Sequence, residues 1–250
     1  MEAAGWKIEL LDVGMVPIGP EHLGPVGAFD GVFESSVNVL LLRGHGRTVL
    51  VDAGSGPLVS LWPGAVDSLD DVLDAEPDLL IATHLDFDHA GGFVTGTWPD
   101  DLEPRFPGRR LLAPAEAVAE ARSSADGDSG TVRVVAALDA AGLLDAYEDG
   151  DEPAPELRLR AAPGHRAGHS IVEIGDSFVH AADVIHHPVY AEHPEWDTEF
   201  DADPELGLET RRALLAELAD RGTTVVASHI AGPGRVVRSG DGFRWESVSG

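Results

Sequence analysis

The stretch Leu79 to Phe93, LLIATHLDFDHAGGF, constrains this chain more than any other. Its apolar start predicts a buried β-strand. Directly after that strand come four potential metal ligands and a glycine pair, namely His84, Asp86, Asp88, His89 and Gly91-Gly92. Side chains of an extended segment alternate with period two, so we expect His84, Asp86 and Asp88 to point the same way. Imidazole nitrogens and carboxylate oxygens together suit zinc, iron or manganese.

The glycine pair is expected to let the backbone turn sharply against a bound metal. The alternative interpretation of the whole stretch is an acidic, solvated turn with incidental histidines. Other predicted strands also end in potential ligands, because His165, Asp183 and His229 each follow a predicted strand. Strand ends gathered along one sheet edge can converge on one small cavity. Asp52, which ends the strand predicted at 48–51, either orients a ligand or forms a turn with Gly54.

The segment THLDFDHAGG resembles the ligand loop of the metallo-β-lactamase superfamily, whose usual form is His-x-His-x-Asp-His. The resemblance continues in order with LVDAGSG (50–56), APGHRAGH (161–169), HAADV (180–184) and ASHI (227–230). It implies the four-layer αββα metallo-β-lactamase sandwich, an α/β fold, as a single domain over residues 1–250. Asp86 departs from the pattern, since it stands where the family usually has its second histidine.

The resemblance also implies a site with two divalent metal ions. One ion would take His84, Asp86 and His165, the other Asp88, His89 and His229, and Asp183 would bridge them. In the family's Pro-Gly-His-x-x-Gly-His pattern the first histidine is the ligand, which favours His165 over His169. Zinc is the preferred metal, and the oxygen of Asp86 makes manganese or iron possible. The competing interpretation is that Asp86 ligates poorly and that only one metal binds tightly.

Composition bounds the remaining functions. The chain has 250 residues, no cysteine and a formal net charge of −27. Such an acidic chain lacks the basic surface that nucleic acids or anionic membranes require, and no apolar segment is long enough to span a bilayer. The sequence shows no secretory signal and has no thiol for a disulfide, so cytoplasmic residence is expected. We therefore expect a small-molecule substrate, with neither nucleic acid nor membrane as a partner.

Hydrophobic patterning predicts the order of the elements. Strands are expected at 6–13, 37–43, 48–51, 79–82, 111–112, 157–161, 171–174, 178–182, 223–227, 236–237 and 243–248. Helices are expected at 68–75, 115–122, 131–141 and 204–221. The segments 14–36, 98–110 and 186–200 are expected to be irregular.

The resemblance is strongest to compact lactonase-like members of the superfamily. It implies a metallo-hydrolase in which a metal-bound hydroxide opens a lactone or cleaves a similar carboxylic ester. Asp88 and His186 are the candidates for proton transfer, and His186 stands where related lactonases hold a tyrosine. Phe29, Phe33, Trp196 and Phe200 are expected either to cover an apolar substrate or to anchor loops. Two alternatives stay open: phosphoester or phosphotriester hydrolysis at the same metals, and a catalytically silent metal-binding protein.

Five further histidines, His22, His45, His180, His187 and His193, are expected to be structural or solvated.

Overall fold

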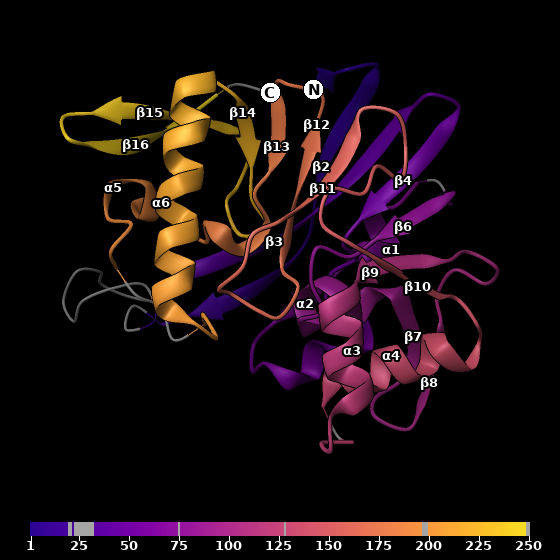
Figure 1. Ribbon diagram of the computed structural model, residues 1–250. Coiled ribbons are helices and arrows are strands. Elements are labelled where there is room, and N and C mark those ends of the chain that lie inside the picture. Colours follow the sequence, from indigo (N-terminus) through magenta and orange to yellow (C-terminus); the bar gives the residue numbers. More distant parts are fainter. Residues whose placement is uncertain (20–21, 23–32, 75, 128, 197–199, 249–250) are drawn as a thin grey trace. The chain divides into compact units, whose positions relative to one another are not determined.

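The computed structural model describes residues 1–19, 22, 33–74, 76–127, 129–196 and 200–248 (Figure 1). Its contacts divide the chain into two compact units. The N-terminal unit comprises Gly5–Val16 and Val37–Glu148, and the C-terminal unit comprises Met1–Ala4, Pro17–Ser36 and Asp149–Gly250. The single domain expected over residues 1–250 stays a prediction. No helix in the described ranges is long and apolar enough to cross a membrane.

The N-terminal unit is built on a mixed sheet with the strand order β2-β3-β4-β6-β9-β10, in which β5 pairs with β2. Its strands are β2 (Trp6–Ile18), β3 (Phe33–Gly44), β4 (Arg47–Val51), β5 (Val66–Asp67), β6 (Leu79–Ile81), β9 (Leu111–Pro114) and β10 (Leu144–Tyr147). A separate hairpin joins β7 (Val94–Thr97) to β8 (Asp101–Pro104). The first residues of β3 and the last of β2 belong to the C-terminal unit.

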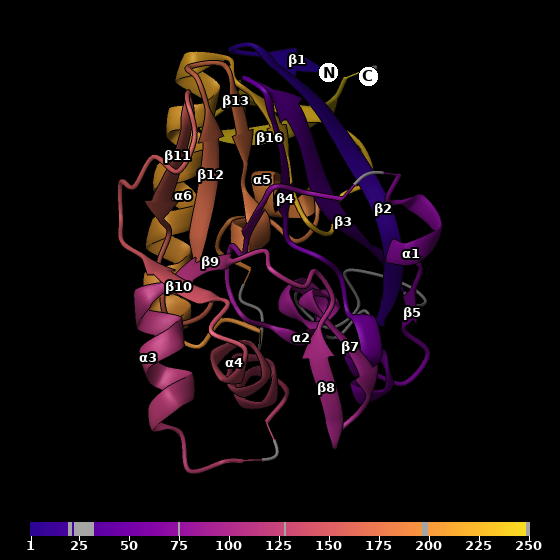
Figure 2. The same ribbon diagram turned by 90° about the vertical axis from the view of Figure 1, so that its right-hand side faces the viewer.

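The helical segments of the N-terminal unit are short. They are α1 (Leu69–Val72), α2 (Phe87–Ala90), α3 (Ala115–Ser123) and α4 (Gly130–Ala140), with 3₁₀ turns η2 (Gly56–Leu61) and η3 (Gly91–Phe93). Helices α3 and α4 pack against each other and against β10 (Figure 2). The strands predicted at 37–43 and 48–51 form the hairpin β3–β4: Gly44 pairs with Arg47, and the loop residues His45 and Gly46 have φ of 50° and 73°. Two positive φ values are what a two-residue type I′ loop requires.

The C-terminal unit holds a sheet with the order β11-β12-β13-β14-β15-β16. Its strands are β11 (Leu157–Ala161), β12 (Ser170–Ile174), β13 (Phe178–His180), β14 (Thr224–Val226), β15 (Gly234–Ser239) and β16 (Gly242–Ser247). The unit also contains β1 (Glu2–Ala3), the 3₁₀ turn η4 (Ala182–Val184), α5 (Val189–Glu192) and α6 (Pro204–Arg221). The long helix α6 runs along this sheet, contacting β15 and β16 (Figure 1).

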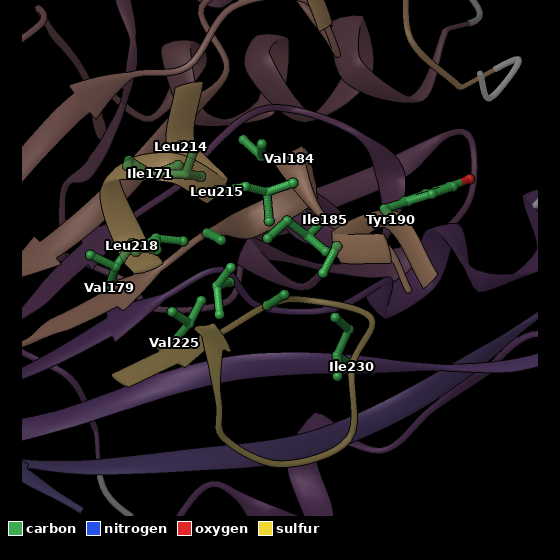
Figure 3. Close-up of a cluster of buried hydrophobic side chains, with 14 of the residues drawn as sticks. Ile171, Val179, Val184, Ile185, Tyr190, Leu214, Leu215, Leu218, Val225 and Ile230 are labelled. Atoms are coloured by element: carbon green, nitrogen blue, oxygen red, sulfur yellow. The ribbon is translucent and has the colours of Figure 1, made fainter. Parts of the chain in front are cut away.

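Helix α6 has the bounds that its sequence predicts, because both ends carry strong signals. The carboxylate of Asp203 accepts a hydrogen bond from the Leu206 amide at 3.1 Å, and Pro204 occupies the first turn. Gly222 ends the helix in a left-handed conformation, with φ of 63°. Its apolar face packs Leu214, Leu215 and Leu218 against Ile171, Val179 and Val225 of the sheet (Figure 3).

Several predicted boundaries were wrong. Strand β2 continues to Ile18 and β3 begins at Phe33, within the segment 14–36 that was expected to be a loop. The segment 98–110, expected to be irregular, contributes β8, and β7 and β10 were not predicted at all. These segments are short or polar, so their own hydrophobic pattern does not indicate a strand. Pairing with a neighbouring strand supplies the hydrogen bonds that define them. Residues 186–200 contain α5, a single helical turn.

We expect Leu215→Ala to lower the free energy of unfolding by about 2–5 kcal/mol, because the buried side chain leaves a cavity. Leu215 is 0% exposed, whereas Leu206 on the same helix is 37% exposed. Leu206→Ala is therefore the matched control and is expected to cost far less. Urea unfolding of the two variants measures the difference; equal losses would show that the contact between α6 and its sheet contributes little.

Candidate metal centre

The predicted ligands of the N-terminal unit follow the ends of parallel strands. Strands β4 and β6 pair in parallel, with Val51 opposite Ile81. Asp52 leaves the first of these strands and His84 the second, so both emerge at the same edge of the sheet. Asp52 takes a left-handed backbone, with φ of 60°, a conformation that aspartate tolerates better than most residues. The sheet topology thus brings Asp52 to the metal-ligand loop.

Asp52 is the centre of a buried hydrogen-bond network. Its Oδ1 accepts from the Thr83 amide at 2.8 Å, and its Oδ2 accepts from the Thr83 hydroxyl at 2.8 Å. The same Oδ2 lies 3.0 Å from His89 Nδ1. Because the single hydroxyl proton of Thr83 goes to Asp52, its Oγ1 must accept the hydrogen bond of 3.0 Å from His84 Nδ1. One carboxylate therefore holds the Nδ1 proton of His89 directly and that of His84 through Thr83.

The four candidates His84, Asp86, Asp88 and His89 form the N-terminal cluster. His84 and His89 have ring centroids 4.0 Å apart. The Nε2 atom of His84 lies 3.9 Å from an Asp86 carboxylate oxygen, and that of His89 lies 4.0 Å from Asp88 Oδ1. Because Nδ1 of each ring is engaged in a hydrogen bond, Nε2 is the nitrogen of His84 and His89 that could bind a metal.

The expectation of an extended segment was wrong beyond Asp86. Asp88 and His89 lie in the helical turn α2, and Asp86 precedes it with an extended backbone. The helical turn is closed by amides of His89 and Ala90 donating to the Asp86 carbonyl at 3.1 and 2.9 Å. The Asp86 side chain does not cap this helix; it is 24% exposed and lies beside His84. This position suits a ligand better than a capping residue, although whether Asp86 ligates stays a prediction.

Gly91 and Gly92 have a different role from the one expected. Neither has a positive φ, so they do not provide a sharp turn. A Cβ atom on Gly92 would lie 1.8 Å from the Ala53 carbonyl oxygen, and one on Gly91 would lie 2.2 Å from that of Ser55. The glycines therefore allow the ligand loop to lie directly against the backbone that follows Asp52. Two hydrogen bonds join these segments, from Ala53 N to His89 O at 2.8 Å and from Gly92 N to Gly54 O at 2.9 Å. We call this contact between residues 89–92 and 53–55 the joint.

In the C-terminal unit, His165, Asp183 and His229 follow β11, β13 and β14. Strands β13 and β14 are parallel, and β11 points the same way because β12 is antiparallel to both β11 and β13. All three residues therefore emerge at one edge of the sheet, as their sequence positions predicted. Together with His186 they form the C-terminal cluster, and all four side chains are buried, with exposures of 3–4%.

Three imidazoles of this cluster face one oxygen. Asp183 Oδ2 lies 3.5 Å from His165 Nε2, 3.4 Å from His186 Nε2 and 3.3 Å from His229 Nε2. The Nδ1 atom of His229 donates to the Ser36 carbonyl at 2.9 Å, and that of His165 donates to Asp201 at 3.2 Å. Two lone pairs therefore point at a carboxylate oxygen, an arrangement that a cation stabilises. The donor set of the cluster fits a divalent metal.

Asp201 is ionised under ordinary conditions. Burial alone would raise the pKa of its carboxyl, but the hydrogen bond to His165 and the neighbouring Arg211 guanidinium hold this pKa at about 2. An ionised carboxylate can only accept, which fixes the proton of His165 on Nδ1.

Both ring nitrogens of His169 form hydrogen bonds with main-chain groups. Its Nδ1 lies 2.9 Å from the Ala162 carbonyl, and its Nε2 accepts from the Asp183 amide at 3.1 Å. Since both ring nitrogens hold main-chain groups, no lone pair is left for a metal. His169 therefore positions Asp183, which favours His165 as the ligand. Ala182 has a left-handed backbone, with φ of 46°, so the turn that delivers Asp183 is strained and needs this support.

His186 is neutral at pH 7. Burial lowers its pKa to about 4, outweighing the neighbouring Asp183, which acts in the opposite direction. The ring stacks on His229, with centroids 5.6 Å apart and an interplanar angle of 5°. Phe200 lies 6.0 Å from it, centroid to centroid. His186 thus contacts both His229 and Phe200.

The other aromatic candidates are placed as follows. Phe33 packs edge-on against His187 at 4.6 Å, and Trp196 stacks on His193 at 4.2 Å. Phe29 lies outside the described residues. In the N-terminal unit, Trp62 stacks on Phe87, with ring centroids 6.4 Å apart. Phe87 lies between Asp86 and Asp88 in the sequence.

Comparison with known proteins identifies the family of this chain. The model of the metallo-β-lactamase superfamily matches residues 32–229, and the chain belongs to that superfamily. The predicted α/β fold class is confirmed, and so is the predicted enzyme class, a metallo-hydrolase. A comparison with curated protein sequences gave no match.

Several solved structures are similar over nearly the whole chain. AidC, a dizinc quorum-quenching lactonase in complex with a product, is 19% identical, with a TM-score of 0.85 over 100% of this chain and 97% of AidC. A probable metal-dependent hydrolase from Staphylococcus aureus is 16% identical, with a TM-score of 0.79 over 100% and 99%. A quorum-quenching N-acyl homoserine lactone lactonase is 18% identical, with a TM-score of 0.72 over 92% and 94%. At these identities the likeness shows the fold.

Sequence reasoning missed the residues that hold the candidate ligands in place, namely Thr83, Ser36, Asp201 and Arg211. Thr83 directly precedes His84, so its polar side chain was a local signal. Ser36 acts through its carbonyl, which any residue supplies. Asp201 and Arg211 are distant in sequence from His165 and carry no motif of their own.

We expect Asp52→Asn to destabilise the N-terminal unit by about 1–3 kcal/mol, because an amide cannot accept from all the donors that the buried carboxylate serves. Zinc affinity should also fall, by about 10–100-fold, since His84 and His89 lose their orientation. Chemical unfolding and zinc competition with a chelator measure the two effects. Asp241→Asn, in the exposed turn between β15 and β16, is the control; if both variants behaved alike, the Asp52 network would have no orienting role.

Proposed function

We propose that the chain binds two divalent ions through its candidate ligands, as the superfamily pattern implies. His84, Asp86 and His165 would bind one ion, Asp88, His89 and His229 the other, and Asp183 would bridge them. The single observation that supports a metal at this centre is the approach of two proposed ligands, His165 and His229, whose Nε2 atoms lie 3.5 and 3.3 Å from Asp183 Oδ2. Zinc is the preferred metal, with manganese or iron as alternatives because of the carboxylate of Asp86.

We further propose that the enzyme opens a lactone or cleaves a similar carboxylic ester of a small molecule. When bound, two divalent ions supply hydroxide at neutral pH by lowering the pKa of a coordinated water. Ring opening adds hydroxide to the carbonyl carbon, breaks the bond to the ring oxygen and delivers a proton to that oxygen. Asp88, a carboxylate of the N-terminal cluster whose side chain is 11% exposed, can carry the proton between water and the leaving oxygen.

His186 is proposed to contact the substrate carbonyl. Its neutral ring can donate one hydrogen bond to the carbonyl oxygen, where negative charge develops as the bond forms. Phe200 beside it would give the substrate's apolar part a surface to lie on. The lactonases among the similar structures support this substrate class. Cytoplasmic residence, and the lack of nucleic-acid or membrane partners, stay predictions.

A metal analysis with a substrate panel tests the proposal. The full chain, produced with zinc, manganese or iron supplied, should bind two ions per chain. The panel should contain lactones, open-chain esters, phosphomonoesters, phosphodiesters and phosphotriesters, and we expect the highest kcat/KM with a lactone or carboxylic ester. Preference for a phosphoester would replace the proposed substrate. A metal content that never exceeds one would overturn the dinuclear site, and full loading without any turnover would support a silent metal-binding protein.

We expect His186→Phe to keep its metals and to lower kcat/KM by about 10²–10⁴-fold. Phenylalanine preserves the stacking on His229 but removes both ring nitrogens. His193→Phe changes an exposed histidine of the same unit, whose side chain is 44% exposed, and should leave kcat/KM near the wild-type value. Steady-state kinetics together with metal analysis separate the roles; wild-type kcat/KM in a metal-loaded His186→Phe enzyme would show that His186 does not act on the substrate.

A further inference from the structure

Helix α6 contains a buried arginine that neither the ligand motifs nor the proposed reaction includes. Arg211 is 2% exposed and lies on the same inward side as Leu214 and Leu218. A guanidinium removed from water requires compensating acceptors and a counter-charge. The next residue on the helix, Arg212, is exposed to solvent, so an arginine on this turn is not buried by necessity. The burial of Arg211 therefore calls for a specific role.

Arg211 connects three separate segments of the C-terminal unit. Its Nη2 donates to Asp201 Oδ2 at 2.8 Å, and its Nε donates to the Val184 carbonyl at 2.8 Å. A longer contact of 3.4 Å joins Nη1 to the Pro194 carbonyl. The guanidinium also lies over the Tyr190 ring, 5.1 Å from its centroid. These contacts fix the plane of the guanidinium.

Two of these contacts lead to candidate metal ligands. Asp201, held by Arg211 through Oδ2, uses its other oxygen for His165 Nδ1 at 3.2 Å. Val184, whose carbonyl Arg211 holds, directly follows Asp183 in the sequence. One buried cation thus restrains the orientation of His165 and the backbone that carries Asp183.

Glycine contacts bring the same helix against the His165 loop. A Cβ atom on Gly164 would lie 2.3 Å from the Gly207 Cα, and one on Gly207 would lie 2.7 Å from Asp201 Oδ2. The Asp203 amide donates to the Gly164 carbonyl at 2.9 Å, and the Thr210 hydroxyl donates to the Pro163 carbonyl at 2.7 Å. The loop therefore rests on the first turns of α6, and Gly207 leaves room for the Asp201 carboxylate.

We propose that Arg211, acting through Asp201, is a positioning residue for the metal centre. It holds the Asp201 carboxylate where that group accepts the Nδ1 proton of His165, so the Nε2 lone pair of His165 faces Asp183. Gly207 contributes to the same positioning, because any side chain at this residue displaces the Asp201 carboxylate. The inference rests on the proposed function only in treating His165 as a metal ligand.

Zinc release from the full chain tests the positioning role of Arg211. We expect Arg211→Met to weaken one of two zinc ions by about 10–100-fold, measured by competition with a chelator, because loss of an outer partner of a ligating histidine has that effect. Arg212→Met makes the same change at the exposed neighbour and should leave zinc affinity unchanged. Arg211→Lys keeps the charge but cannot reach Asp201 and Val184 with a planar fork, so we expect only partial recovery.

Gly207→Ala provides a second, independent variant. Alanine favours a helix interior over glycine, so a purely structural role of α6 predicts unchanged zinc affinity. The positioning role predicts weaker zinc binding, because the new Cβ displaces Asp201. If Arg211→Met does not fold, this variant decides. Wild-type zinc affinity in folded Gly207→Ala, together with equal affinities in the Arg211→Met and Arg212→Met variants where both fold, would overturn the proposal.

Nitrogen-15 NMR of the imidazole rings distinguishes this inference from the proposed function. In the wild type, His165 should carry its proton on Nδ1, and in Gly207→Ala and Arg211→Met that preference should be lost. Loss of the preference in a protein that binds no zinc at all would refute the proposed metal centre while supporting the positioning by Arg211. An unchanged His165 ring in both variants would refute the positioning role whatever the zinc content.

Discussion

The candidate centre depends on how each histidine is held at Nδ1. A neutral imidazole can ligate through one nitrogen only if its proton stays on the other. Here a carboxylate, a hydroxyl or a main-chain carbonyl occupies the Nδ1 side of His84, His89, His165 and His229. The Nε2 atoms are thereby left facing the carboxylates of the two clusters. Without these hydrogen bonds the same residues would be four buried histidines of undefined tautomer.

The sheets explain how such distant residues acquire this order. In each unit, the strands that end in ligands or their partners run in the same direction. Chemistry is therefore concentrated at strand ends, while the strands themselves are filled by apolar side chains such as Leu50, Ile81 and Val179. The residues of the hydrophobic core and the candidate ligands therefore occupy different parts of each strand.

Sequence patterns predicted the strands that precede the candidate ligands, because an apolar or alternating segment followed by His or Asp is a local signal. Helix α6 was predicted to the residue, since Asp203, Pro204 and Gly222 mark its ends. The hairpin β7–β8 and the extension of β2 were missed because pairing between strands, and not local hydrophobicity, defines them. The helical turn α2 replaced an expected extended segment, as the backbone hydrogen bonds to Asp86 outweigh a period-two pattern of polar residues.

The supporting residues could not be predicted from sequence for a different reason. Arg211 lies on a helix among leucines, and its acceptors come from segments that are irregular or far away along the chain. Only the folded unit shows that Asp201 stands between Arg211 and His165. Motifs describe atoms that touch a metal, whereas the groups that orient those atoms are defined by three-dimensional packing.

The joint between Gly91-Gly92 and the backbone of Ala53 and Ser55 has a consequence for engineering this enzyme. There is no space for even one methyl group between the two segments, so they behave as a single part. A library that randomises the ligand loop, or a chimera that takes the loop from one parent and residues 53–56 from another, would combine surfaces that were not shaped together. Diversity introduced at the aromatic side chains around His186 leaves this joint intact. If the substrate binds beside His186 as proposed, substitutions that alter substrate choice can be confined to the C-terminal unit.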